Sequence, residues 1–244
     1  MRIISIHLLN EQDGLKIAFE KDNPFEKPTK QELSILKDGI NNMLPDEDIT
    51  ADFYDQEYFS SKTANKKNGL TNYEEFSKTF PPEHSQWVEQ FIPKDVVKQD
   101  YKIHEIGCAF GWTVDELRRR GYDASGSDIS KYVVEKHPRD YITQKDWSKN
   151  TFLKGTSNLI YSLATFEHIS LEDVRLLFAN IQTSICVGGI LFATIDDRWG
   201  QDLSHVSIKS RNWWNNIARQ YSFEVMEEET NKVFKINGYV WRRI

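Results

Sequence analysis

The sequence predicts an α/β fold in which a mostly parallel, seven-stranded sheet has helices on both faces and an antiparallel last strand. From Tyr101 onward, short apolar runs alternate with stretches of helical periodicity, which is typical of βαβ units. The 244 residues are 39% hydrophobic and 13% aromatic, enough for one sizeable core. The predicted parts are a hairpin-and-helix extension at 1–45, an aromatic lid or preface at 46–100 and the main domain at 101–244.

The chain opens with a predicted β-hairpin. Residues 3–9 and 15–19 are apolar, β-rich runs, and Asp13-Gly14 supplies the turn between them. A capping-box pattern followed by apolar residues at helical intervals then predicts a helix that ends at Pro45. Because hairpin and helix are too small to bury a core of their own, we expect them to pack on the main domain or across a homodimer.

The main domain provides the seven strands. The first five are predicted at 102–106, 124–127, 140–143, 158–163 and 190–195, with helices between them at 112–120, 130–137 and 171–185. We expect Gly188-Gly189 to end the last of these helices. A helix from Ser210 to about Tyr221 precedes two strands at 223–226 and 239–244, which are expected to pair antiparallel at the end of the sheet.

Composition disfavours several classes of protein. Lys and Arg number 31 against 37 Asp and Glu, a formal charge of -6, so no basic excess favours nucleic acid. Cys108 and Cys186 have no second Cys or His at metal-ligand spacing, which argues against a disulfide framework or a zinc site. The pattern of an export signal and an apolar run of membrane-spanning length are not found. We therefore expect a cytoplasmic protein that binds neither nucleic acid nor membrane.

The loop between the first strand and first helix of the main domain is the most informative segment. Gly107, Ala109 and Gly111 alternate with larger residues, so the backbone can approach a ligand closely, and the following helix offers its N-terminal N–H groups. A dinucleotide fingerprint would need glycine at 109 and 112, where this chain has Ala109 and Trp112, and a P-loop would need Gly-Lys-Ser/Thr. NAD, FAD and nucleoside triphosphates are therefore disfavoured.

Two acids flank this loop. Glu105 precedes the first glycine, where it would repel a pyrophosphate and attract an ammonium group; its alternative role is an ordinary salt bridge. Asp128 ends the second strand, where a carboxylate can accept both hydroxyls of a ribose. The acid-apolar-Gly-x-Ala-x-Gly motif and the second acid resemble those of class I, Rossmann-like S-adenosylmethionine-dependent methyltransferases. The resemblance spans roughly 53–244 and implies S-adenosyl-L-methionine as cofactor and S-adenosyl-L-homocysteine as product.

The resemblance also implies positions that contact the cofactor. Asp146 matches the place of an adenine contact, although it could equally cap a turn, and Trp147 would flank the base. The segment Tyr54 to Phe59 is similar to the aromatic stretch that covers the methionine end. Asn158 departs from the family's Asp at the start of the fourth strand. The complete set of predicted cofactor residues is Tyr58, Glu105, Gly107, Cys108, Ala109, Gly111, Asp128, Ile129, Asp146, Trp147 and Leu163.

The loop after the fifth strand is predicted to carry the acceptor chemistry. A hydroxyl acceptor needs a nearby base, and His205 is the leading candidate, with Asp202 or Asp197 to orient it and His168 as a second catalytic candidate. Either histidine could instead have a structural role. Asp196, Asp197 and His205 could hold a divalent ion, but the prediction is made without a metal. Predicted substrate contacts are Glu167, Asp197, Arg198, Trp199 and Arg211.

The sequence thus predicts methyl transfer from S-adenosylmethionine to a small molecule. Short Asp-x-Ser-His segments like that at 202–205 are similar to those of methyltransferases acting on surface-polysaccharide precursors, which favours a hydroxyl of a sugar, nucleotide-sugar or other phosphate-bearing glycan precursor. The alternatives are N- or O-methylation of another small metabolite, or a catalytically silent partner subunit that binds the cofactor.

Overall fold

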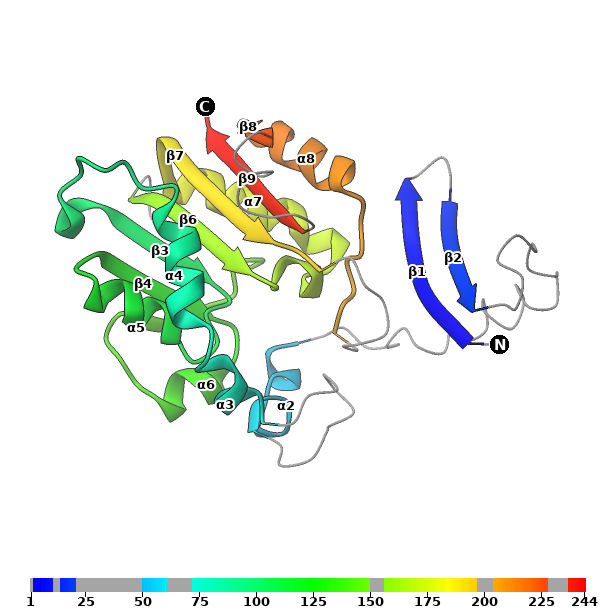
Figure 1. Cartoon of the computed structure of the whole chain (residues 1–244), viewed down its shortest axis with the longest axis horizontal. Coiled ribbons are helices and arrows are strands. Elements are labelled where there is room, and N and C mark those ends of the chain that lie inside the picture. The colour runs from blue at the N-terminus through cyan, green and yellow to red at the C-terminus, as the bar shows by residue number, and fades with distance from the viewer. Residues whose placement is uncertain are drawn as a thin grey trace.

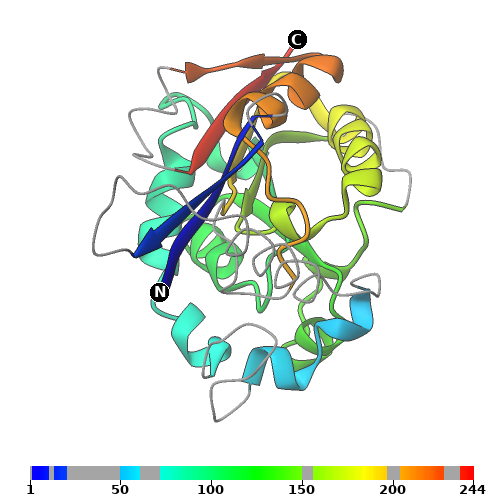
Figure 2. The ribbon, with the colours of Figure 1, turned by 90° about the vertical axis from the view of Figure 1, so that its right-hand side faces the viewer.

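The computed structural model describes residues 2–10, 14–20, 50–60, 72–149, 156–196, 204–227 and 237–244. Its centre is a seven-stranded sheet with the order β5-β4-β3-β6-β7-β9-β8 (Figure 1). The strands are β3 Lys102–Ile106, β4 Asp123–Asp128, β5 Ile142–Gln144, β6 Ser157–Leu163, β7 Ile185–Thr194, β8 Phe223–Val225 and β9 Gly238–Arg243. β9, red in Figure 2, pairs antiparallel with both β7 and β8, whereas β5, β4, β3, β6 and β7 pair in parallel. The predicted fold class is confirmed.

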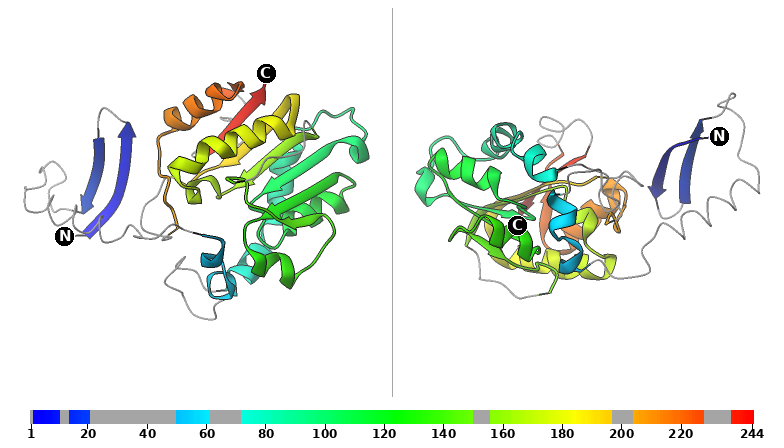
Figure 3. Two further views of the ribbon diagram at one scale, coloured as in Figure 1. Left: turned by 180° about the vertical axis from the view of Figure 1, so that it is seen from behind. Right: turned by 90° about the horizontal axis from the view of Figure 1, so that it is seen from below.

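Helices cover both faces of the sheet. α4 Pro81–Glu89 and α5 Trp112–Arg119 share one apolar cluster with β3 and β6, while α7 Leu171–Ser184 and α8 Arg211–Gln220 share the other with β6 and β7. Neighbouring residues on one strand point to opposite clusters: Ile160 belongs to the second and Tyr161 to the first. Opposite views show α4 on one side and α7 with α8 on the other (Figures 1 and 3).

The structure corrects two sequence predictions. Gly188-Gly189 does not end a helix, because α7 stops at Ser184 and β7 runs through both glycines, which lie within the irregular pairing with β6 between Ile185 and Ile190. A Cβ at Gly189 would lie 2.9 Å from the Asn158 carbonyl oxygen, so glycine there permits close strand contact instead. β5 also begins later than predicted, at Ile142, because the Ile142 N–H closes a turn onto the Arg139 carbonyl.

The predicted hairpin is confirmed. β1 Arg2–Asn10 and β2 Gly14–Glu20 form an antiparallel two-stranded sheet in which the backbone of Leu8 is in register with that of Leu15. The helix predicted up to Pro45 lies outside the described residues. Across the described part of the chain, none of the helices has the length and apolar character needed to cross a bilayer.

Several short helices lie between β2 and β3 in the chain, and two more lie within the main domain. They are η1 Ala51–Phe53, α2 Gln56–Ser60, α3 Tyr73–Ser77 and η2 Lys98–Asp100, while α6 Lys131–Lys136 and η3 Phe166–His168 belong to the main domain. Tyr58 and Phe59 of α2 pack in a small apolar cluster with Phe110 and Val133. This packing places α2 and its aromatic side chains over the loop that follows β3.

Polar contacts fasten the same short helices to α6. The Glu74 carboxylate accepts hydrogen bonds from Lys136 Nζ at 2.5 Å and Ser60 Oγ at 3.2 Å, and lies 2.9 Å from His137 Nε2. Burial alone would raise the pKa of Glu74, but the Lys136 and His137 partners lower it to about 2. An ionised Glu74 therefore joins α2, α3 and α6 at neutral pH.

Candidate functional site

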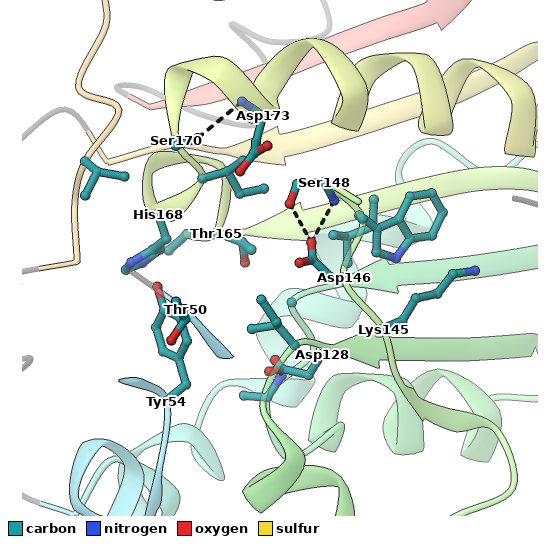
Figure 4. Close-up of a pocket in the computed structure, with 18 of the residues that line it drawn as sticks. Thr50, Tyr54, Asp128, Lys145, Asp146, Ser148, Thr165, His168, Ser170 and Asp173 are labelled. Atoms are coloured by element: carbon teal, nitrogen blue, oxygen red, sulfur yellow. Dashed lines mark hydrogen bonds between the residues drawn. The ribbon is translucent and has the colours of Figure 1, made fainter. Parts of the chain in front are cut away.

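A cavity of about 660 Å³ opens where the parallel strands end (Figure 4). Its lining includes Ile106, Asp128 and Leu163 from the last positions of β3, β4 and β6, and Tyr58 from α2. Ligands of open α/β sheets bind at this edge, and the volume suits a small-molecule site. Of the predicted cofactor residues, the cavity is lined by Tyr58, Gly107, Ala109, Asp128, Ile129, Asp146, Trp147 and Leu163.

The loop after β3 has an unusual backbone. Gly107, Ala109 and Gly111 all have positive φ, at 72°, 45° and 72°. The N–H groups of Gly107 and Cys108 donate to the Ser127 carbonyl at 2.8 and 3.0 Å, which fixes the loop to the end of β4. The predicted alternation of small residues therefore coincides with a left-handed backbone conformation at all three positions.

The Thr165 side chain fills the space where a side chain at position 107 would lie. A Cβ there would lie 2.2 Å from Thr165 Oγ1 and 2.4 Å from Thr165 Cγ2. Glycine at this position thus lets the segment after β6 approach the loop after β3, and both residues line the cavity. The sequence alone predicts only that a small residue lets a ligand approach, because the contact with Thr165 depends on how distant segments pack.

Asp128 links the loop to the cavity. Its Oδ2 accepts from the Ala109 N–H at 2.8 Å and its Oδ1 accepts from the Ser130 N–H at 2.8 Å. Burial raises the pKa of Asp128 to about 6, and the backbone hydrogen bonds partly oppose that rise. Because each carboxylate oxygen has two lone pairs, both can still accept a ligand hydroxyl.

We expect the affinity for S-adenosylmethionine to depend on the ionisation of Asp128. Ribose hydroxyls bind more strongly to a carboxylate than to a carboxylic acid, so affinity should rise with pH through about 6 and level off above it. Below that pH the loss should approach roughly tenfold per pH unit. Calorimetric titration from acidic to neutral pH measures this, and Asp128→Asn should flatten the profile; the same profile in both proteins contradicts the assignment.

Asp146 and Trp147 border another part of the cavity. Asp146 Oδ1 accepts from the N–H and Oγ of Ser148 at 2.9 and 2.6 Å (Figure 4), so Asp146 shapes a turn, one of the two roles that the sequence left open. Trp147 is buried, and Lys145 Nζ lies 5.0 Å from the centre of its ring. Lys145 also lines the cavity, a contact that sequence analysis missed.

A buried polar chain holds Trp147 in place. Trp147 Nε1–H donates to Ser127 Oγ at 2.7 Å, and His104 lies between Ser127 Oγ at 2.9 Å and Ser125 Oγ at 2.8 Å. Burial lowers the pKa of His104 to about 3, so its ring is neutral. Since Ser125 Oγ donates to the Ile103 carbonyl, the consistent assignment has Ser127 donating to Nε2 and Nδ1–H donating to Ser125.

Three predicted cofactor residues lie behind the cavity wall rather than on it. Glu105 is buried and accepts a 2.9 Å hydrogen bond from Tyr161, its partner in register on β6; burial raises its pKa to about 8. Cys108 fills the space beside Gly126, where a Cβ would lie 2.9 Å from its Sγ. A Cβ at Gly111 would lie 2.9 Å from Ile142 Cδ1. These residues support the loop.

The acceptor candidates meet at the end of the cavity near Tyr54. His168 lines the cavity, and its ring packs edge-on against those of His205 and Tyr54, with centroids 4.6 and 6.1 Å apart. Glu167 is buried, and its Oε1 accepts from the Asp196 N–H at 2.8 Å. The structure therefore brings Glu167, His168 and His205 together, although the sequence placed Glu167 among the substrate contacts only.

Arg211, another predicted substrate contact, does not join this group. Arg211 Nη1 donates to the Gly238 carbonyl at 2.6 Å, and its guanidinium lies 4.5 Å from the centre of the Tyr239 ring, so it ties α8 to β9. The remaining candidates, Asp197, Arg198, Trp199 and Asp202, lie outside the described residues. Further described residues line the cavity without having been predicted: Thr50, Tyr73, Lys149, Ser170, Glu172, Asp173 and Val206.

The fold and a family profile together place the protein in the class of Rossmann-like, S-adenosylmethionine-dependent methyltransferases. The profile, described as "Methyltransferase domain", matches residues 73–234, which is more than half of the chain. The protein belongs to this methyltransferase family, which implies S-adenosyl-L-methionine as its cofactor. A search of curated proteins returned no match.

Solved structures show the same fold at low identity. A S-adenosylmethionine-dependent methyltransferase from Clostridium acetobutylicum has a TM-score of 0.56 and 12% identity, covering 70% of this chain and 98% of that one. A TehB-like SAM-dependent methyltransferase from Corynebacterium glutamicum has a TM-score of 0.54 and 17% identity, covering 71% and 97%. Phosphoethanolamine N-methyltransferase 2 from Haemonchus contortus, in complex with S-adenosyl-L-methionine, has a TM-score of 0.52 and 15% identity, covering 66% of this chain and 52% of that one.

Proposed function

We propose that this methyltransferase acts on a hydroxyl group of a small, polyhydroxylated acceptor such as a sugar, nucleotide-sugar or other phosphate-bearing glycan precursor. The observation that carries the proposal is the group formed by Glu167, His168 and His205, in which one nitrogen or oxygen atom of each residue lies within 4.8 Å of the others. Hydroxyls need such groups because they are poor nucleophiles until the proton is removed.

The reaction is an in-line displacement. The acceptor oxygen attacks the methyl carbon, a new C–O bond forms as the S–CH3 bond breaks, and the sulfonium becomes a neutral thioether. Asp128 would hold the adenosyl ribose, and the aromatic residues Tyr54 and Tyr58 would exclude water from the reacting atoms. The acceptor proton would leave toward Glu167, His168 and His205.

The rest of the lining favours a polar acceptor. Thr165, Ser170 and Asp173 offer hydroxyl and carboxylate groups that can hydrogen-bond to sugar hydroxyls. Lys145 and Lys149 are the cations among the described lining residues, but Lys145 lies over the Trp147 ring and Lys149 Nζ lies 3.6 Å from Asp146 Oδ2, in the part of the cavity predicted for the cofactor. The polar groups near His168 therefore support an uncharged sugar hydroxyl as the first acceptor to test, with sugar phosphates beside it.

We expect His205→Ala to reduce turnover of the acceptor by roughly 10²- to 10⁴-fold, the usual contribution of positioned acid–base groups. The affinity for S-adenosylmethionine should be nearly unchanged because His205 packs against His168, away from Asp128. Formation of S-adenosylhomocysteine with a panel of sugars, sugar phosphates, nucleotide-sugars and amines measures turnover. His84→Ala is the matched control. His84 lies in α4, its ring stacks on that of Phe80, and it does not line the cavity. Equal turnover in wild type and His205→Ala would remove His205 from the mechanism.

N-methylation of a small amine is the second candidate. Glu172 and Asp173 both line the cavity, and their carboxylates would attract an ammonium group. A neutral amine can react without a base, so amine turnover should survive His205→Ala. Turnover confined to the amines of the panel, and retained in that variant, would favour this candidate over hydroxyl methylation.

A further inference from the structure

Glu167, His168 and His205 have the composition of a metal site. Glu167 and His168 are consecutive in η3, and His205 comes from the segment that follows β7. One ligand atom from each lies within 4.8 Å of the others. Ligands about 2.1 Å from a shared ion in tetrahedral geometry are roughly 3.4 Å apart, so small side-chain rotations would bring these atoms into coordination distance.

Neighbouring residues position the His168 ring and hold the two backbone segments of this group together. His168 Nδ1 lies 2.7 Å from Ser204 Oγ, and Ser204 is fully buried. The Glu167 carbonyl accepts from the N–H groups of Val206 and Ser207, both at 2.9 Å, so the segment that carries His205 is held against η3. Metal-binding residues typically have such outer partners, which orient the ligand atoms.

Burial and charge also suit a cation. Glu167 has 0% of its surface exposed, and a carboxylate is stabilised in such a place when a cation lies beside it. Two imidazoles and one carboxylate prefer ions such as Zn²⁺, Co²⁺ and Mn²⁺, whereas Mg²⁺ prefers oxygen ligands only. This group shares His205 with the set that the sequence offered for a divalent ion, Asp196, Asp197 and His205, but replaces the two aspartates by Glu167 and His168.

We propose that Glu167, His168 and His205 bind a divalent transition-metal ion at the acceptor end of the cavity. His168 and Val206 line the cavity, so an ion held there would face the acceptor. In a role that rests on the proposed function, the ion would bind the acceptor hydroxyl and lower its pKa, and the proton would pass to water. His205 would then act on the reaction as a ligand of the ion.

The test is titration of chelator-treated protein with Co²⁺ and Zn²⁺, without acceptor. We expect one ion per chain by calorimetry and a visible Co²⁺ absorption band that Zn²⁺ removes. His205→Ala and His168→Ala should each weaken Co²⁺ binding at least tenfold, whereas His84→Ala should leave it unchanged. Because S-adenosylmethionine affinity is measured on the same samples, a variant that fails to fold is recognised.

The outcomes separate this proposal from the proposed function. If wild type binds neither ion, or if both histidine variants bind Co²⁺ as tightly as wild type, the metal site is overturned. Hydroxyl methylation that continues at full rate after chelation overturns it as well, and leaves the proposed function intact. Ion binding that needs both histidines, in a protein that methylates only amines, supports the site and rejects the hydroxyl acceptor.

Discussion

Replacement of Gly107 by alanine is expected to abolish binding of S-adenosylmethionine and to destabilise the fold. The added Cβ would lie 2.2 Å from Thr165 Oγ1, and Gly107 has a φ of +72° that other residues rarely adopt. Left-handed backbone costs about 1–2 kcal/mol, and overpacking a close contact costs about 1–3 kcal/mol more. Since Gly107 and Thr165 both line the cavity, any shift that relieves the clash distorts the cofactor site.

Gly188→Ala is the matched control for this variant. Gly188 has a similar φ of +81°, but nothing lies within 4 Å of the position that its Cβ would take. Thermal unfolding should therefore show a loss about 1–3 kcal/mol larger for Gly107→Ala than for Gly188→Ala, and only Gly107→Ala should lose cofactor binding in calorimetry. Equal losses of stability with cofactor binding kept in both would show that the Thr165 contact has no such role.

Replacement of Asp128 by alanine should weaken S-adenosylmethionine binding by roughly 10²-fold or more. A hydrogen bond to a charged group contributes about 1.5–3 kcal/mol, and a ribose can donate two of them. The substitution also removes the acceptor of the Ala109 and Ser130 N–H groups, which loosens the loop itself.

Asp128→Asn separates these two effects. Asparagine keeps the shape and one acceptor oxygen but no charge, so its affinity should fall between those of wild type and Asp128→Ala. Calorimetric titration with S-adenosylmethionine and S-adenosylhomocysteine gives both values. Wild-type affinity in Asp128→Ala would place the ribose elsewhere in the cavity.

The fold could be predicted from sequence because its signals are local. The glycine loop, the apolar strands and the helix caps at Ser170 and Ser210 act within a few residues, and the structure shows both serine caps accepting from the third residue of their helices. The boundary between α7 and β7 was missed because the helix passes directly into the strand at Ile185. Apolar periodicity alone does not separate a buried helix end from a buried strand.

The candidate site was predictable only where one segment determines it. Asp128 and Gly107 follow from strand ends and loop spacing. The contact of Glu105 with Tyr161 could not be predicted, because it depends on the register of two strands and joins residues 56 apart in sequence. The meeting of Glu167 with His205 depends likewise on tertiary packing, and no spacing rule along the chain reveals it.

The position of β9 has a consequence for how the protein is made. β9 follows β8 in the chain yet lies between β7 and β8, and it is the strand through which β8 joins the sheet. As the chain leaves the ribosome, β8 and the outer edge of β7 therefore emerge before the strand that pairs with them. Until Gly238–Arg243 has left the ribosome and paired with them, those edges present unpaired backbone groups that another chain could pair with.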